Sequence, residues 1–170
     1  MTSVVLSIGS NIGDRFARLQ SVVDGLGDAV RAVSAVYETD AWGGVEQHPF
    51  LNAVVIADDS ESDPYGWLRR AQEFERAADR VREVRWGPRS LDVDLVTCHD
   101  GEAEVILRDE DLTLPHPYAH QRAFVLVPWL DADADATLTV ADEVRPVEKL
   151  LAGLDRDERA GVRHTRLVLG

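Results

Sequence analysis

Apolar residues recur along the chain at strand-like or helical spacing, and their order predicts a mixed α and β protein. The apolar run Val4–Ile8 is typical of a strand. Apolar residues three and four positions apart predict a helix over 15–26, which Gly27 should end. Further apolar runs predict strands over 30–39 and 50–57.

A second helix and a further strand follow. Asp63 and Pro64 are typical of an N-cap and a first helical position, and apolar residues continue at helical spacing to about Val81. The alternating run 91–98 predicts a strand, and the Asp-Gly pair after it predicts a hairpin turn into a short strand over 103–107. This is the ferredoxin-like βαββαβ order, so we expect an α+β fold with helices over one face of a sheet.

The last third of the chain predicts additional short strands and helices. We expect a short helix within "TLPHPYAHQRAFVLVPWL", another within "EVRPVEKLLAGL", and a late strand, at a sheet edge, within "VRHTRLVLG". The sequence contains no internal repeat or linker, and 170 residues suit one domain with a full hydrophobic core. We therefore expect a single domain over 1–170.

Composition and charge narrow the classes of partner. Hydrophobic residues make up 45% and charged residues 29% of the chain, as in soluble globular proteins, and the formal net charge is −13. This charge disfavours nucleic acid or an anionic membrane and leaves small molecules as partners of an expected monomer. We expect a cytoplasmic location, because the N-terminus lacks a signal sequence and the apolar run "AFVLVPWL" is too short to cross a bilayer. Cys98 is the single cysteine, which excludes an internal disulfide and a thiolate zinc cluster.

The stretch "RWGPRSLDVDL" (85–95) carries the main candidate for chemistry. Apolar residues alternate with Asp92 and Asp94, which places both carboxylates on one strand face about 6.6 Å apart. Like charges on one face repel, so something positive should lie between them. Two carboxylates without a nearby His or Cys suit Mg²⁺, which takes its remaining ligands from water and substrate phosphates. The alternative is a solvated outer strand face.

Arginines are concentrated just before this strand. The window 69–89 holds seven arginines and four acidic residues, a local positive excess within an acidic chain. Guanidinium groups bind phosphate oxygens bidentately and stay charged at any working pH, so this window predicts an anion site beside the aspartates. For Arg76 and Arg80 the alternative is compensation of a helix dipole. His116 and Arg122 mark a second segment that can face phosphate.

A site for a flat ring is indicated on a different strand. Phe50 and Asn52 share one strand face, and an aromatic ring beside an amide suits a planar heterocycle with hydrogen-bond donors and acceptors. The alternative is a core phenylalanine with a surface or bulge asparagine. Trp42, Trp86 and Phe124 are further candidate ring partners.

Several motifs, taken together and in this order, are similar to those of a known family. "SIGSNIGDR", "YETDAWG", "FLNAVV", "RWGPRSLDVDL" and "LPHPYAHQRAFVLVP" resemble the 6-hydroxymethyl-7,8-dihydropterin pyrophosphokinases of folate biosynthesis. The resemblance runs from Gly9 to Phe124 and is weak beyond Pro128. It implies a ferredoxin-like α+β fold, which agrees with the order of elements above.

The resemblance also implies roles for individual residues. Asp92 and Asp94 match the aspartates that hold two Mg²⁺ ions, and Arg82 and Arg89 complete the expected catalytic set. The residues that match the ATP site are Gln72, Glu75, Arg80, Arg82, Arg89, Leu95, Thr113, His116 and Arg122. The residues that match the pterin site are Gly9, Thr39, Trp42, Phe50, Asn52, Trp86 and Phe124.

The implied reaction transfers pyrophosphate from ATP to the hydroxymethyl group of the pterin and releases AMP. Metal ions would neutralise phosphate charge, and arginines would stabilise charge on the bridging and leaving oxygens. Two other hypotheses stay open on the residues alone. One is a Mg²⁺-dependent nucleotide phosphohydrolase with water as the nucleophile, and the other is a non-enzymatic ferredoxin-like binding module.

Overall fold

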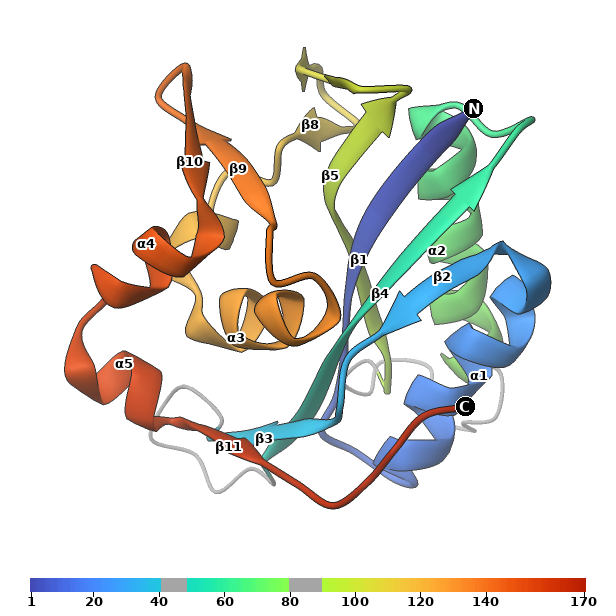
Figure 1. Ribbon diagram of the computed structural model, residues 1–170. Coiled ribbons are helices and arrows are strands. Elements are labelled where there is room, and N and C mark those ends of the chain that lie inside the picture. The colour runs from blue at the N-terminus through green and yellow to red at the C-terminus, as the bar shows by residue number, and fades with distance from the viewer. Residues whose placement is uncertain (41–48, 80–89) are drawn as a thin grey trace.

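The structure of the protein, a computed structural model, describes residues 1–40, 49–79 and 90–170 (Figure 1). Its centre is a sheet of the strands β1 (Thr2–Ser10), β2 (Val30–Val33), β3 (Tyr37–Thr39), β4 (Phe50–Asp59), β5 (Asp92–Asp100), β6 (Ala103–Glu104) and β11 (Val162–His164). The strand order is β11-β3-β4-β1-β5-β6, and β2 also pairs with β4. Neighbouring strands pair antiparallel, so the predicted α+β class is confirmed.

Two helices cover one face of this sheet, α1 (Arg15–Leu26) and α2 (Pro64–Asp79) (Figure 1). The side chain of Asp63 accepts a hydrogen bond from the Gly66 N–H at 2.7 Å, so it caps α2 as predicted. Helix α1 ends at Gly27, whose φ of 55° lies in the left-handed region that favours glycine. Residue type therefore sets where each of these helices begins or ends.

The strands meet these helices through an apolar core. Alternate residues of β1 point toward α1 and α2, and Leu6 and Ile8 among them are 2% and 0% exposed. They pack in one cluster with Leu19 of α1 and Trp67 of α2, and the indole N–H of Trp67 donates to the Thr2 hydroxyl at 2.9 Å. Fully burying such a side chain stabilises a fold by about 1.5–3 kcal/mol. These buried apolar positions therefore determine which face of each strand packs against the helices.

The expected helices over one face are α1 and α2, and the opposite face of the sheet is also covered, which the sequence analysis did not predict. Leu126 and Trp129 of α3 (Ala123–Ala132) belong to a second apolar cluster with Val5, Val54 and Val96 from three strands. These strands carry apolar residues on both sides, so a second layer is needed to bury them. The covering elements are η2 (Ala119–Gln121), α3 (Ala123–Ala132), β9 (Thr137–Val140), β10 (Glu143–Pro146) and α4 (Val147–Ala152).

Some predicted elements are divided in the structure. The strand expected over 30–39 forms β2 and β3, because the Ser34 hydroxyl between them accepts the Val54 N–H at 2.9 Å and interrupts the ladder. The stretch "EVRPVEKLLAGL" begins with β10, which pairs with β9, and only its second part is helical. The segment after the hairpin turn forms β6 and β7 (Leu107–Arg108) instead of one strand.

The remaining elements complete the description of the fold. They are η1 (Gly27–Ala29), β7 (Leu107–Arg108), β8 (Thr113–Leu114) and α5 (Arg156–Ala160). Strand β11 lies at an edge of the sheet, as predicted. The predicted end of the second helix near Val81 lies outside the described residues. In the described part of the chain, no helix combines the length and apolarity needed to span a membrane.

Candidate active site

A cavity of about 320 Å³ opens on the face of the sheet that α3 covers. Strands β1, β3, β4 and β5 contribute to its lining, together with the start of α3. The lining residues are Ser7, Gly9, Thr39, Asp40, Phe50, Asn52, Asp92, Asp94, Arg122 and Phe124. All of them except Ser7 and Asp40 are residues that the sequence predicts for the site.

The two aspartates share this face because of the strand register. In the antiparallel pair of β1 and β5, Ser7 lies opposite Asp94 and Gly9 lies opposite Asp92. The intervening Val93 is buried in the core beneath α1 and α2. Since side chains alternate along a strand, both carboxylates point to the side of the cavity. The common strand face predicted for the aspartate pair is therefore confirmed.

Glycine at position 9 leaves room for the Asn52 side chain, which crosses it. A Cβ atom on Gly9 would lie 2.7 Å from the Asn52 Oδ1, closer than Cβ contacts in real structures. Asn52 is buried, and its Nδ2 donates to the Thr39 Oγ1 at 2.6 Å. The amide is therefore fixed in the cavity wall, where it can pair with the donors and acceptors of a ligand.

Two aromatic side chains reach the cavity from different elements. Phe50 is the first residue of β4, Phe124 lies in the first turn of α3, and both line the cavity. The guanidinium carbon of Arg122 lies 5.6 Å from the centre of the Phe124 ring and 5.7 Å from that of Tyr118. Such cation–π contacts favour a guanidinium close to the ring. The cavity therefore combines aromatic walls, a fixed amide, a cation and two carboxylates.

Three residues predicted for the nucleotide lie outside the lining of the cavity, in or against the layer that α2 forms with β5. Glu75 of α2 accepts a hydrogen bond from the Val93 N–H at 3.0 Å, so its carboxylate lies against β5. Gln72 is exposed one turn earlier on the same helix. Leu95 is buried in the core, on the opposite side of β5 from the aspartate pair.

Two further predicted nucleotide residues lie at a separate cavity. Thr113 and His116 line a space of about 290 Å³ together with the hairpin of β9 and β10. The Nδ1 of His116 accepts a hydrogen bond from the Tyr118 N–H at 3.1 Å. Burial and, second, the positive charge of Arg122 lower the pKa of His116. The imidazole is therefore neutral near pH 7 and carries its proton on Nε2.

The chain matches a known protein family over most of its length. Residues 5–134 match the family described as 7,8-dihydro-6-hydroxymethylpterin-pyrophosphokinase (HPPK). The chain belongs to this family. The family and the activity predicted from the sequence, pyrophosphoryl transfer from ATP to hydroxymethyldihydropterin in folate biosynthesis, are thereby confirmed.

Relatives of known name agree with this family. The 2-amino-4-hydroxy-6-hydroxymethyldihydropteridine pyrophosphokinase of Mycobacterium tuberculosis is 62% identical over 168 residues, which cover 96% of this chain and 89% of that protein. The enzyme of the same name from Mycobacterium leprae is 62% identical over 175 residues, which cover 99% of this chain and 92% of that protein. The one from Bacillus subtilis is 36% identical over 146 residues, covering 81% and 84%.

Solved structures support the fold. Wild-type Plasmodium falciparum HPPK-DHPS superposes with a TM-score of 0.63 at 13% sequence identity, covering 89% of this chain and 44% of that chain. A structure described as HPPK-DHPS in complex with substrates gives a TM-score of 0.62 at 11% identity, covering 89% and 43%. The chain thus spans less than half the length of these solved chains. At such identities the similarity shows a shared fold.

The sequence analysis did not predict two residues of the HPPK cavity, and five of the residues that it did predict lie outside the described ones. Ser7 lies on the same strand face as Gly9, so a period of two already pointed to it. Asp40 directly follows Thr39, where the chain leaves β3. The predicted residues that lie outside the described residues are Trp42, Arg80, Arg82, Trp86 and Arg89.

The aspartate pair of this HPPK site has the donor chemistry that Mg²⁺ prefers. Carboxylate oxygens are hard ligands, and Mg²⁺ is commonly held by one or two carboxylates together with substrate phosphates and water. Over 1–40, 49–79 and 90–170, no group of three or more His, Cys, Asp or Glu side chains is arranged to hold a metal ion. Asp92 and Asp94 can therefore supply two carboxylate ligands to such an ion.

Proposed function

We propose that this chain transfers the pyrophosphoryl group of ATP to 6-hydroxymethyl-7,8-dihydropterin in a Mg²⁺-dependent reaction that releases AMP. One observation carries the proposal: Asp92 and Asp94 line the same cavity as Phe50, Asn52 and Phe124. A carboxylate pair suits a metal–phosphate complex, and an amide with two aromatic side chains suits a pterin ring. The acceptor hydroxyl and the triphosphate would therefore meet in one cavity.

On the pterin side, we propose that the ring stacks between Phe50 and Phe124 and that its polar edge pairs with Asn52. The 2.6 Å hydrogen bond from Asn52 to Thr39 supports this role, because it holds the amide before the substrate binds. Preorganisation of this kind lowers the entropy cost of binding. Gly9 would leave room for the amide, and Trp42 and Trp86 are proposed as further pterin contacts from the family resemblance.

On the phosphate side, Asp92 and Asp94 would hold two Mg²⁺ ions, which when bound neutralise phosphate charge and make the acceptor hydroxyl more acidic. The hydroxymethyl oxygen forms a bond to the β-phosphorus of ATP, the bond from that phosphorus to the oxygen of AMP breaks, and the hydroxyl proton is released. Arginines stabilise the charge that develops on the bridging and leaving oxygens. Arg122 lines the cavity and suits this role, and Arg82 and Arg89 are proposed to share it.

The rest of the nucleotide is proposed to lie along β5 and the segment that leads to α3. Glu75 lies against β5, and a neutral His116 offers its Nε2–H as a donor to a phosphate oxygen. Leu95 and Thr113 are proposed near the adenine. The complete proposed nucleotide set is Gln72, Glu75, Arg80, Arg82, Arg89, Leu95, Thr113, His116 and Arg122.

The proposal extends to the description of the core and to the state of the protein. The element order from β1 to β5, with β3, β4, β1 and β5 as successive neighbours in the sheet, supports a ferredoxin-like core. We also propose a single domain, a monomer and a cytoplasmic location, and a free, buried Cys98 suits a reducing compartment. Size-exclusion chromatography with light scattering should give a mass near 18.8 kDa.

Identification of the nucleotide product tests the proposed reaction. The protein is incubated with ATP, Mg²⁺ and 6-hydroxymethyl-7,8-dihydropterin, and the nucleotides are separated by chromatography. We expect AMP to form only when both the pterin and Mg²⁺ are present. Formation of ADP, or loss of ATP without the pterin, would instead support a phosphohydrolase. No turnover in any mixture would support a binding module.

A further inference from the structure

The segment 155–163, which lies beyond the family match, returns to the cavity. The match to HPPK ends at residue 134, but β11 pairs with β3, and Val162 lies opposite the cavity residue Thr39. Figure 1 shows β11 running beside β3 after α5. A neighbouring space of about 380 Å³ is lined both by the segment 155–162 and by the cavity residues Thr39, Asp40 and Phe124. This segment therefore borders the site.

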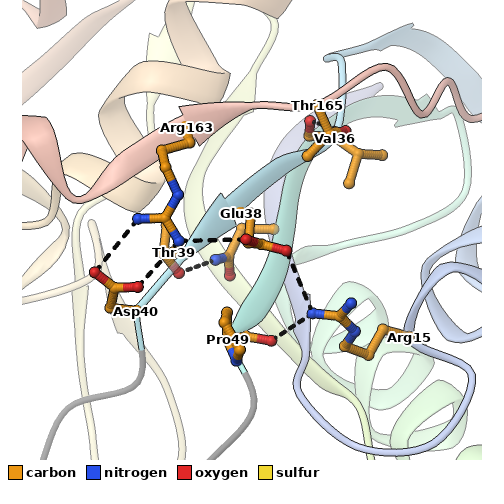
Figure 2. A network of polar contacts seen from close by, with 9 residues as sticks. Arg15, Val36, Glu38, Thr39, Asp40, Pro49, Arg163 and Thr165 are labelled. Atoms are coloured by element: carbon orange, nitrogen blue, oxygen red, sulfur yellow. Dashed lines mark hydrogen bonds and ion pairs between the residues drawn. The ribbon is translucent and has the colours of Figure 1, made fainter.

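Arg163 of β11 contacts the wall of the cavity that β3 supplies (Figure 2). Its Nη2 lies 3.0 Å from the Oδ1 of Asp40, and its Nη1 lies 3.3 Å from the Oδ2, so the carboxylate is held by two hydrogen bonds. The same Nη2 lies 3.3 Å from the Oε1 of Glu38. Hydrogen bonds from Arg163 and its charge lower the pKa of Asp40. One arginine therefore orients a cavity residue and compensates two carboxylates.

The contacts continue from Arg163 to the start of β4 (Figure 2). The Oε2 of Glu38 lies 3.7 Å from the Nη1 of Arg15, and that nitrogen donates to the Pro49 carbonyl oxygen at 2.7 Å. Pro49 directly precedes Phe50, which lines the cavity. The network therefore joins the end of β3 to the residue before the aromatic wall of β4.

Glu158 of α5 contacts the other wall, which α3 supplies. Its Oε1 accepts a hydrogen bond from the Ala123 N–H at 3.2 Å. Helix α3 begins at Ala123, and Arg122 at its N-cap position makes no capping bond with its own side chain. The first N–H groups of a helix need acceptors, so Glu158 replaces the missing cap from 35 residues away. Phe124 and Arg122, which flank Ala123, both line the cavity.

From these contacts we infer that residues 158–163 form a C-terminal brace that positions both walls of the pterin side of the cavity. Arg163 acts on the wall of β3 and β4, and Glu158 acts on the wall of α3. Both are positioning residues, since they act on the cavity through other side chains and backbone groups. The inference rests on the proposed function, and it predicts that the brace governs pterin affinity more than the rate of phosphoryl transfer.

The test compares steady-state constants for the pterin and for ATP in the full chain. Arg163→Ala should raise the KM for the pterin by about three- to fivefold, the size expected for loss of a partly exposed ion-pair network, with kcat and the KM for ATP within about twofold of wild type. Glu158→Ala should raise the pterin KM by about fivefold through loss of the helix cap. Glu158→Gln should restore it, because its amide oxygen still accepts the Ala123 N–H.

Arg31→Ala is the matched control for Arg163. Arg31 of β2 forms a 2.7 Å ion pair with Asp58 near the end of β4, on a different surface of the protein. Its side chain is about as exposed as that of Arg163. Arg31→Ala should leave both KM values unchanged. A general loss of structure would lower the melting temperature and kcat without separating the pterin KM from the ATP KM.

The outcomes distinguish failure of the brace from failure of the proposed function. If wild type forms AMP but Arg163→Ala and Glu158→Ala behave like Arg31→Ala, the brace is refuted and the proposed function stands. If Glu158→Gln fails to restore what Glu158→Ala loses, the capping contact is not the cause. If wild type neither forms AMP with the pterin nor binds it in a fluorescence titration, the proposed function fails and the brace with it.

Discussion

The two faces of the central sheet are built from the same strands but are covered in different ways. On the face toward α1 and α2, alternate residues of β1, β4 and β5 are apolar and buried in one continuous core. On the other face, Val5, Val54 and Val96 pack with α3. Further along that face, the same strands carry Ser7, Asn52 and the aspartate pair, which line the cavity.

This difference shows that the site lies where a short helix leaves part of the sheet uncovered. Helix α3 has 10 residues, whereas α2 is described over 16. Charged side chains are tolerated on a strand where no apolar layer packs on them, because burying an unpaired charge is costly. Stability should therefore depend mainly on one face and catalysis on the other, and substitutions should separate the two.

Loss of a cavity aspartate should have the largest effect on activity. Asp94→Ala, and likewise Asp92→Ala, should lower kcat by about 100-fold or more, since a ligand for Mg²⁺ beside the phosphates is lost. The free energy of unfolding should change by less than about 1 kcal/mol, as at most surface positions. AMP formation and urea unfolding measure the two effects. Asp100→Ala, at the other end of β5, is the control and should keep wild-type kcat. Full turnover by Asp94→Ala would contradict the metal assignment.

A truncation on the core face should give the opposite result. Leu6 is adjacent to Ser7 but points toward α1 and α2, and it is buried. Leu6→Ala should lower the free energy of unfolding by about 2–5 kcal/mol through lost burial and a cavity, while kcat per folded molecule stays close to wild type. Urea titration with an activity assay measures both. Val144→Ala, at a residue that is 68% exposed, should change neither. A selective loss of kcat in Leu6→Ala would break the separation of the two faces.

Crowding of the cavity wall should have a smaller, selective effect. Gly9→Ala would place a Cβ atom 2.7 Å from the Asn52 Oδ1 and displace the amide. We expect the KM for the pterin to rise by about three- to tenfold, the cost of one hydrogen bond, with the KM for ATP unchanged. Gly153→Ala is the control, because its Cβ would meet only ordinary contacts at 3.6 Å. An equal rise in both KM values would show that Gly9 is needed for the structure of the sheet and not specifically for binding the pterin.

Alkaline pH should have the smallest effect and should act on both faces, because each face contains one buried weak acid, Cys98 or Tyr37. Burial, with a smaller effect of Asp100, raises the pKa of Cys98 from 9.0 to about 11, and burial, followed by Asp131, raises that of Tyr37 from 10.0 to about 12. Folding favours the protonated form of both groups. Their contribution to stability is therefore fully present below pH 9 and is lost as the pH rises through about 11 and about 12.

Urea unfolding between pH 8 and 11 measures this loss. Tyr37→Phe keeps the ring but removes the hydroxyl, so its stability should fall less steeply above pH 10 than that of wild type. In wild type, Cys98 should react with a thiol reagent at pH 8 only after unfolding. Rapid reaction in the folded protein would contradict the burial of that face.

Features with a local physical cause were predictable from the sequence. Asp63 as a helix cap and Gly27 as a helix end follow from residue type, and the common face of Asp92 and Asp94 follows from the period of two. The interruption at Ser34 was not predictable, because it depends on a bond to a strand 20 residues away. The covering of the second face by α3 was missed for a similar reason, since apolar runs do not say which surface they bury.

From the sequence alone we could predict the α+β class, the shared face of the aspartate pair, and the family with its reaction. The ion pair of Arg163 with Asp40, 123 residues earlier in the chain, follows from the folded structure alone. The spacing of apolar residues and the residue types at helix ends determine local structure through the backbone geometry of neighbouring residues. Contacts between remote segments depend instead on strand register and on the surfaces left uncovered once the core has packed.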